Sequence, residues 1–196
     1  MKDAAGKIYE FIFRGILADS ALDKVGRKRS VYEGMFADQE ELLNILSIND
    51  LEQNLVKDAT VMAVIYIAIS AFENSVRKLI SQVLIEVDRE KWWEKCVSSK
   101  IRTKVSSRQE EEQKFRWHSR RGQDFLNYTD LSDLENIISQ NFKCFEPYIQ
   151  SLDWVKSVFD VIEKSRNVIM HSGYLEREDI ERIGINIRDW IKQVGA

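Results

Sequence analysis

The amino-acid sequence predicts an all-α protein, a helical bundle of roughly six to eight helices. Its 196 residues include a single proline and only eight glycines, so the chain has few points at which a long helix must end. Apolar residues recur at spacings of three and four along most of the chain, which is the period of a helix with one buried face. The composition, 44% hydrophobic and 31% charged, is that of a globular protein long enough to bury a core.

The chain is predicted to divide into a helical extension, residues 1–50, and a main helical domain, residues 51–196. Residues 3–18 predict a first helix, whose apolar face carries Ile8, Phe11, Ile12 and Ile16. A short basic loop at residues 26–30 separates it from one or two further helices over residues 31–46. Core candidates in this second stretch are Met35, Phe36, Leu42, Leu43 and Leu46.

The central element is predicted to be a long helix, or a broken pair, from Leu51 to about Asp88, with Asn49 and Asp50 as its cap. Its centre, Ala59 to Phe72, has apolar residues on nearly every face, as expected of a buried helix in the middle of a bundle. This run of about 14 residues is shorter than the roughly 18–20 residues needed to cross a bilayer. The sequence does not begin with the apolar stretch of a signal peptide. We therefore expect no membrane segment.

Four further segments are predicted to complete the bundle. Residues 92–115 predict one helix with a solvated face of alternating charge. A new helix begins after a cap at Thr129 or Asp130, and Pro147 ends or kinks the segment that follows. Aromatic core residues expected there are Phe142, Phe145 and Tyr148.

The last two helices are predicted from Ser151, as a cap, to a stop at Gly173, and over residues 179–194. Each has one apolar stripe. The first stripe consists of Val155, Val158, Phe159, Ile162 and Ile169, and the second of Ile180, Ile183, Ile187, Trp190 and Ile191.

The charge and the cysteines limit the functional classes. A net charge of −3 gives no overall attraction to nucleic acid, so any contact with RNA must come from a local patch. The two cysteines, Cys96 and Cys144, are too few to define a disulfide or metal-binding framework. We read them as reduced thiols of a cytoplasmic protein.

One candidate site is the arginine at position 166 and the histidine at position 171, near the end of the helix that Ser151 starts. Spacing alone is weak support for it, because such a pair arises close to chance. On an ideal helix Arg166 lies about 40° from the centre of the apolar stripe and about 140° from His171. Arg166 then either pairs with a core carboxylate such as Glu73 or occupies a polar pocket at an interface. His171 has an alternative role, in which a protonated imidazole complements the helix dipole. The two reach one ligand only if the helix end distorts or a partner subunit supplies the missing side.

A second candidate site is a basic and aromatic segment in a predicted loop, comprising Arg116, Trp117, His118, Arg120 and Arg121. Arginine and aromatic side chains together bind phosphate and stack on unpaired bases, although a solvated basic turn has the same composition. Upstream, Glu73 and Arg77 have the spacing of an ion pair on one helix, and Arg77 is also placed to supply charge to a nearby site.

The stretch from Arg166 to His171, R-N-V-I-M-H, resembles the R-x4-6-H signature of the HEPN superfamily, in which the residue after the arginine is commonly polar, as Asn167 is here. The chain also resembles one branch of the HEPN superfamily over residues 128–134, the pair Ile137 and Ile138, and the aromatics Phe142, Phe145 and Trp154. That branch was first described beside a PIN nuclease in a perinuclear transcript-surveillance endonuclease. Residues 72–80 resemble its upstream helix. The resemblance covers about residues 60–190 and does not extend to residues 1–50, and we recognise no PIN domain in this sequence.

This resemblance implies a helical bundle that forms a homodimer, with two motifs facing each other across a shared cleft. It also implies a metal-independent endoribonuclease that needs no cofactor, acts on RNA, and belongs to a toxin–antitoxin, antiviral or similar defence system. His171 would act as general base or acid, Arg166 would hold the phosphate, and Asn167 would orient either group. The products would carry 2′,3′-cyclic phosphate and 5′-hydroxyl ends.

Two other functions remain open from the sequence. One is a non-catalytic module that binds RNA or a nucleotide, or that serves for dimerisation, which the net charge of −3 favours. The other is an antitoxin or scaffold in which residues 1–50 dock a protein partner.

Overall fold

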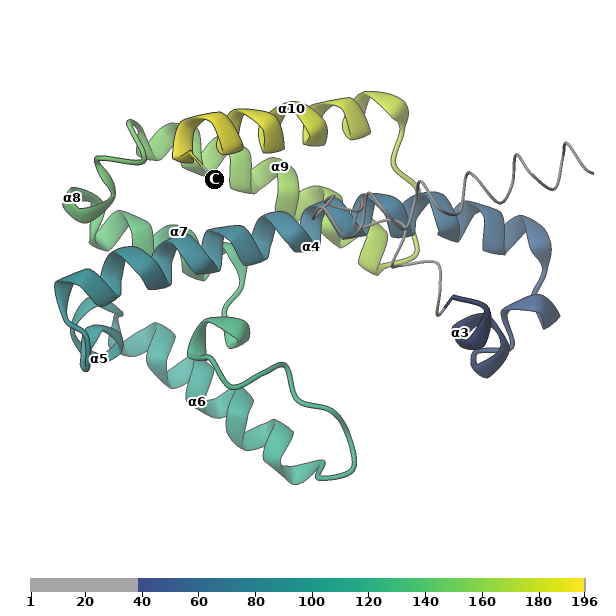
Figure 1. The fold of residues 1–196 in the computed structure, drawn as a ribbon, viewed down its shortest axis with the longest axis horizontal. Helices are drawn as coiled ribbons and strands as arrows, with labels where there is room; N and C mark the ends of the chain where they lie inside the picture. Colours follow the sequence, from purple (N-terminus) through teal and green to yellow (C-terminus); the bar gives the residue numbers. More distant parts are fainter. Residues whose placement is uncertain (1–38, 196) are drawn as a thin grey trace, which may run out of the picture. The chain divides into compact units, whose positions relative to one another are not determined.

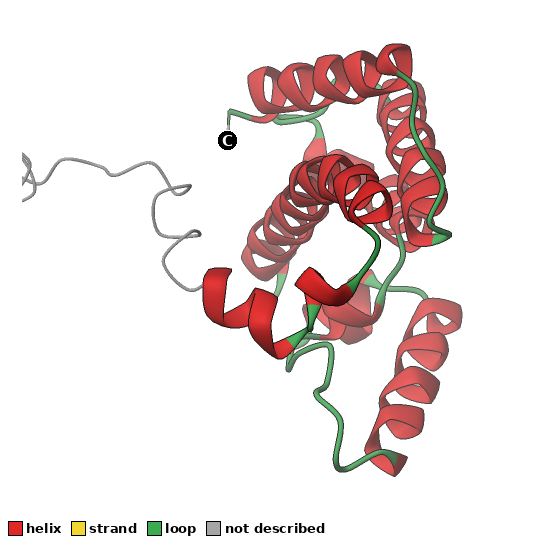
Figure 2. Ribbon diagram, turned by 90° about the vertical axis from the view of Figure 1, so that its right-hand side faces the viewer, coloured by secondary structure: helices red, strands yellow, loops and turns green. Residues whose placement is uncertain are grey.

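The computed structural model describes residues 39–195, and this part of the chain is helical without a strand (Figure 1, Figure 2). The prediction of an all-α fold is confirmed. The predicted helix at residues 3–18 and the stretch 31–38 lie outside the described residues. In chain order the elements are α3 (Gln39–Ile45), the 3-10 helix η1 (Ile48–Asp50), α4 (Gln53–Val87), α5 (Trp92–Cys96), α6 (Ser99–Lys114), the 3-10 helix η2 (Phe125–Tyr128), α7 (Leu131–Gln140), α8 (Phe142–Phe145), α9 (Leu152–Met170) and α10 (Arg177–Val194).

The chain separates into two compact units, residues 1–56 and residues 57–196, and the division falls inside α4. In the first unit, Asn49 and Asp50 lie within η1 and do not cap α4, which corrects that prediction. The turn at η1 closes through hydrogen bonds from the Asp50 and Leu51 amides, and Leu51 then has an extended backbone, so α4 begins later, at Gln53. A domain boundary at residues 50 and 51 stays a prediction.

An aromatic cluster joins α4, α9 and α10 in the second unit. Phe72 of α4 meets the rings of Phe159 and Trp190 edge-on, with centroids 5.9 and 5.4 Å away. Trp190 of α10 also stacks on Trp154 of α9, with ring centroids 5.6 Å apart and planes 11° from parallel. Large rings bury much apolar area and favour these offset and edge-on arrangements, so the cluster fixes how the three helices pack.

The helices α7 and α8 extend the core beside α9. The buried face of α7 consists of Leu131, Leu134, Ile137 and Ile138, and Phe145 of α8 is fully buried. Two predicted caps are confirmed. The Asp133 carboxylate accepts a hydrogen bond from the Asp130 amide at 3.0 Å, which forms half of a capping box, and the Ser151 hydroxyl accepts one from the Trp154 amide at 3.3 Å.

The predicted single helix at residues 92–115 is wrong, because the chain forms α5 and α6 with a break at Val97. Val97 has an extended backbone and a buried side chain. The Cys96 carbonyl accepts a hydrogen bond from the Asn141 amide group at 2.8 Å, a partner that is distant in the sequence. Tertiary contacts therefore interrupt a segment that local periodicity reads as continuous. The last helix also begins two residues earlier than predicted, at Arg177.

The prediction that the centre of α4 is buried on every side is half wrong. Met62, Ile65, Ile69 and Phe72 lie in the core, whereas Val61, Val64, Tyr66 and Ile67 are exposed. Within residues 39–195, α4 is the one helix that is long and apolar enough to cross a membrane, and 22% of its most apolar window is buried. Core helices of soluble proteins meet the same criterion of length and composition.

An ion-pair network links α6 to the start of α7. Arg108 binds both carboxylate oxygens of Asp130, at 3.1 and 2.8 Å, and Lys104 lies 3.0 Å from Asp130 and 2.7 Å from Asp133. Burial opposes ionisation of Asp130, but the hydrogen bonds from Arg108 and Lys104 prevail and lower its pKa from 3.8 to about 2.

We predict that Asp130 makes the domain acid-sensitive. A carboxyl group with a lowered pKa in the folded state contributes stability that is present above about pH 4 and is lost as the pH falls toward 2. Its contribution is on the order of 1 kcal/mol, because the side chain is 35% exposed and solvent screens the pairs. Asp130→Asn should therefore lose less stability than the wild type between pH 5 and pH 2 in thermal melts.

The control for the change in net charge is Asp160→Asn on α9, whose exposed carboxylate has Lys164 at 3.9 Å. Identical pH profiles of the wild type and Asp130→Asn would show that Arg108 and Lys104 do not favour the ionised carboxylate.

Candidate functional site

Arg166 lies at the margin of the buried stripe of α9, where helix geometry predicts it. Its Nε atom is 3.4 Å from Oε1 of Glu73 on α4, and the side chains of Arg166 and Glu73 are 31% and 9% exposed. Of the two predicted environments for Arg166, pairing with a core carboxylate is therefore the one that the structure contains. A guanidinium at the edge of an apolar stripe needs such a partner, because an unpaired charge there is costly.

Glu73 is shared between two arginines. Its Oε2 atom accepts a hydrogen bond from Nη2 of Arg77 at 3.0 Å, which confirms the predicted ion pair one turn apart on α4. Arg77 also donates to the carbonyls of Leu126 and Thr129, at 3.0 and 3.3 Å, and thus holds η2 and the start of α7 against α4. One carboxylate balances two guanidinium groups, so the cluster keeps a net positive charge.

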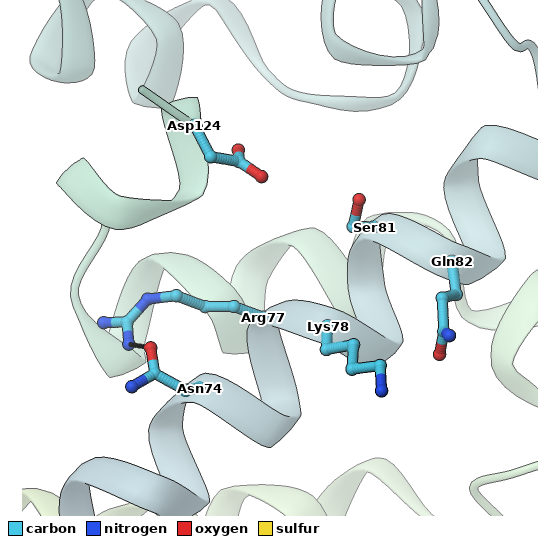
Figure 3. Close-up of a pocket in the computed structure, with 6 residues that line it drawn as sticks. All are labelled: Asn74, Arg77, Lys78, Ser81, Gln82 and Asp124. Atoms are coloured by element: carbon cyan, nitrogen blue, oxygen red, sulfur yellow. Dashed lines mark hydrogen bonds between the residues drawn. The ribbon is translucent and has the colours of Figure 1, made fainter. Parts of the chain in front are cut away.

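A hollow of about 400 Å³, lined by polar and charged residues that include Arg77, lies beside α4. Figure 3 shows Arg77 reaching Asn74, to whose oxygen it donates at 3.2 Å, while Asp124 faces α4 from the segment that precedes η2. The remaining lining residues, all on α4, are Lys78, Ser81 and Gln82. Because Arg77 donates to four acceptors, its role here is to position η2 rather than to offer a free charge.

The two terminal nitrogens of Arg166 differ from those of Arg77 in their hydrogen bonding. Neither makes a hydrogen bond with any residue of the described chain, and the closest approach of the guanidinium to the Glu73 carboxylate is at Nε. The two Nη atoms of an arginine form a planar fork that matches two oxygens of a phosphate. Glu73 therefore orients a guanidinium whose outer end is open to a ligand.

His171 occupies the carboxyl-terminal end of α9. It is the C-cap residue, it is exposed, and its ring has no hydrogen-bond partner among residues 39–195. Asn167, one turn earlier, is also exposed. The structure thus turns Arg166 toward α4 and leaves His171 and Asn167 in solvent, as the predicted angular separation implies.

The predicted stop at Gly173 is corrected in its detail. Ser172, not Gly173, has the left-handed backbone, with φ of 58°. The amides of Ser172 and Gly173 donate to the carbonyls of Ile169 and Val168, at 3.0 and 2.8 Å, which is the pattern of a Schellman motif. Gly173 is needed for space, because a Cβ atom there would lie 2.8 Å from a Val168 methyl and 2.9 Å from the Val168 carbonyl oxygen.

The predicted basic and aromatic segment forms the connection between α6 and η2, and its arginines differ in their surroundings. Arg121 pairs with Glu112, with Nε 2.9 Å from Oε1, and its guanidinium lies 5.9 Å from the centre of the Tyr128 ring. Arg116 and Arg120 are exposed, and neither has an ion-pair partner in the described chain. Trp117 is 83% exposed, and His118 Nδ1 lies 2.9 Å from the Ser119 carbonyl.

Sequence reasoning missed Glu112 and Phe115 as members of this region. Both line a cavity with Trp117, His118, Ser119 and Arg121. The acidic run that contains Glu112 read as a solvated helix face, and its position opposite Arg121 depends on a loop closure that has no local sequence signal. An aromatic residue such as Phe115 directly after a strongly polar helix was the available clue.

No group of three or more histidine, cysteine, aspartate or glutamate side chains within residues 39–195 is arranged to hold a metal ion.

A family model described as Swt1-like HEPN matches residues 68–195, which is more than half of the chain and includes Glu73, the α6–η2 connection and the α9 motif. The chain belongs to this HEPN family. No curated protein matches it. No solved structure matches it. The match confirms the resemblance seen in the sequence and the bundle fold of this HEPN domain.

We predict opposite effects on stability from two neighbouring substitutions after the HEPN motif. Ser172→Gly should stabilise the domain by up to about 1 kcal/mol, since a left-handed backbone is unfavourable for residues with a Cβ atom. Gly173→Ala should destabilise it by about 1–3 kcal/mol through the contact with Val168. Urea unfolding measures both, and equal effects of the same sign would contradict the helix end described here.

Proposed function

We propose that this HEPN protein is a metal-independent endoribonuclease whose active site combines Arg166, Asn167 and His171 from two copies of the chain. The observation that carries the proposal is the environment of Arg166, in which Nε lies 3.4 Å from the Glu73 carboxylate while neither terminal nitrogen makes a hydrogen bond in the described chain. Membership of the Swt1-like HEPN family supports a ribonuclease-like domain.

The proposed chemistry is transfer of a phosphoryl group within the RNA. The ribose 2′-oxygen attacks the adjacent phosphorus atom, and the bond from phosphorus to the 5′-oxygen breaks. Imidazole suits the required proton transfers near neutral pH, so His171 either takes the proton from the 2′-hydroxyl or gives one to the departing 5′-oxygen. The Arg166 fork holds the phosphate and balances the charge that develops on it, and Asn167 orients the phosphate or the imidazole. The products are a 2′,3′-cyclic phosphate and a 5′-hydroxyl.

Two copies are required in this proposal because one α9 helix separates its own functional groups. Arg166 faces Glu73, whereas His171 is exposed at the helix end, so a second copy supplies the histidine that faces each arginine. Apolar side chains next to His171 favour such an association, since Met170 and Tyr174 are 58% and 57% exposed. Val64 and Ile67 on α4 provide further exposed apolar surface.

The decisive test is cleavage of RNA in the presence of EDTA. Wild-type protein should cleave, and His171→Ala should lose at least about a hundredfold in rate, because general acid–base catalysis contributes about 10²–10⁴-fold. Arg182→Ala, a change of an exposed arginine on α10, serves as the control for loss of charge. Equal cleavage by wild type and His171→Ala would remove His171 from the mechanism.

A mixing experiment tests whether the site is composite. Arg166→Ala and His171→Ala should each be inactive alone, yet a mixture whose subunits exchange freely should regain about a quarter of wild-type activity. Half of the dimers are then mixed, and each mixed dimer has one intact site. Analytical ultracentrifugation at micromolar concentration should show a dimer. A monomer, or a mixture without activity, would mean that the two residues do not act across subunits.

A second candidate function is a non-catalytic module that binds RNA or a nucleotide. The ion pair of Arg166 with Glu73 favours it, because a carboxylate 3.4 Å away weakens the attraction of that arginine for a phosphate. This module would bind RNA without ever releasing a product.

For either function, the toxin–antitoxin or antiviral setting and a protein partner such as an antitoxin are proposals that rest on the HEPN resemblance. A cytoplasmic location is a proposal that rests on reading Cys96 and Cys144 as reduced thiols.

A further inference from the structure

A cavity of about 460 Å³ opens beside the connection from α6 to η2, away from the residues placed in catalysis. It is lined by Glu112, Phe115, Trp117, His118, Ser119 and Arg121. This volume is within the range of about 300–1,000 Å³ that small-ligand sites occupy. Three of its lining residues are aromatic, so the cavity offers flat surfaces rather than a cluster of charges.

Trp117 has an exposed ring face, unlike the tryptophans of the core. Trp93 lies parallel to Phe125, and Trp154 lies parallel to Trp190, with planes 15° and 11° apart. The neighbours of Trp117 are nearly perpendicular to it, at 87° for Phe115 and 82° for His118. With 83% of the residue in solvent and no parallel partner in the described chain, the indole can accept a flat ring.

Local contacts hold this cavity in shape. Glu112 binds both the side chain and the backbone amide of Arg121, at 2.9 and 3.3 Å. The Tyr128 hydroxyl donates to the Gly122 carbonyl at 3.2 Å, and the His118 amide donates to the Phe115 carbonyl at 3.0 Å. An ordered aromatic site binds with a smaller entropic penalty than a flexible loop does.

The charges of the cavity select a base rather than a phosphate. The carboxylate of Glu112 cancels the guanidinium of Arg121, so the lining is close to neutral. Arg116 and Arg120, on either side of Trp117 in the sequence, are exposed and lack an ion-pair partner in the described chain. A neutral stacking surface on a segment that also carries two exposed cations, Arg116 and Arg120, matches a nucleotide whose base is buried and whose neighbouring phosphates stay outside the cavity.

We propose that this cavity binds one unpaired base of a single-stranded RNA, stacked on the Trp117 indole, with Arg116 and Arg120 on the flanking phosphates. The base must be unpaired, because a base within a duplex has both faces covered by its neighbours. The choice of RNA rests on the proposed function, and the site then restricts this protein to substrates with a single-stranded segment.

Binding of an RNA that cannot be cleaved tests the site apart from catalysis. The probes are a short fluorescent 2′-O-methyl RNA strand, the same strand paired with its complement, and the same strand with its bases removed. Replacing the 2′-hydroxyl removes the nucleophile, so the wild-type protein can be used. Anisotropy titrations measure affinity, and circular dichroism checks the fold of each variant.

We expect the single strand to bind more tightly than the duplex, and Trp117→Ala to weaken single-strand binding about tenfold, as loss of one stacked base does. Trp117→Phe should recover most of this affinity. The strand without bases should bind weakly and with equal affinity to wild type and Trp117→Ala. Arg116→Ala and Arg120→Ala should weaken binding of the single strand with bases and of the strand without bases to the same extent. Arg177→Ala on α10, whose side chain is 87% exposed, should change the affinity for neither strand.

Three results would overturn the proposal. The first is equal affinity of wild type and Trp117→Ala for the single strand, and the second is that Trp117→Ala weakens binding of the duplex as much as binding of the single strand. The third is that Trp117→Ala weakens binding of the strand without bases. The third result would indicate that the indole contacts the backbone or a different class of ligand. If Trp117-dependent binding holds while the wild type cleaves no RNA, the base site stands and the proposed catalysis fails.

Discussion

The carboxylate of Glu73 joins three parts of the domain that are distant in sequence. It binds Arg77 on its own helix, and Arg77 holds the carbonyl of Leu126 within η2 and that of Thr129 before α7. It also faces Arg166 of α9 at 3.4 Å. A glutamate that is 9% exposed needs these partners, since a buried charge without a counterion destabilises the fold. The same residue therefore stabilises the bundle and determines where the proposed catalytic arginine points.

This arrangement explains why the site is open on one side. The Oε1 atom of Glu73 is buried without a hydrogen bond, and the outer nitrogens of Arg166 make no hydrogen bond with the described residues. Arginine presents five donors, and the contact of Arg166 with Glu73 is closest at one of them, Nε. A phosphate at the outer face would complete the coordination of Arg166 without breaking its contact with Glu73, so ligand binding and fold stability do not compete.

Helical periodicity predicted the parts of this structure that depend on one helix at a time. The margin position of Arg166, the pair of Glu73 with Arg77, and the cap at Ser151 all follow from angles and spacings within a single element. The break at Val97 does not, because it results from burial of Val97 and from a hydrogen bond that Asn141 donates. The left-handed Ser172 was also missed, because glycine is the usual residue there and Gly173 stands next to it.

The exposed face of α4 is another feature that depends on tertiary contacts and that helical periodicity did not predict. A run that is apolar around the whole helix predicts burial, but the sequence does not state which surface covers each face. Val64 is 58% exposed, although its residue type and neighbours match those of the buried Ile65. Apolar residues selected for a contact with another molecule look the same in sequence as those selected for the core. Predicting the fold class was therefore easier than predicting the burial of a single helix.

In the two proposals, recognition and chemistry rest on different physical interactions. Near α9 the proposed groups are a guanidinium and an imidazole, which would act on any phosphodiester and so would distinguish RNA sequences poorly. Beside Trp117 the interaction is stacking, which requires a free base face and rejects a duplex. The exposed Arg116 and Arg120 would supply local positive charge for RNA at that loop in spite of the net charge of −3 of the whole chain. Selectivity for single-stranded RNA would then arise at a distance from the bond that is cut, through a surface that leaves the catalytic residues unchanged.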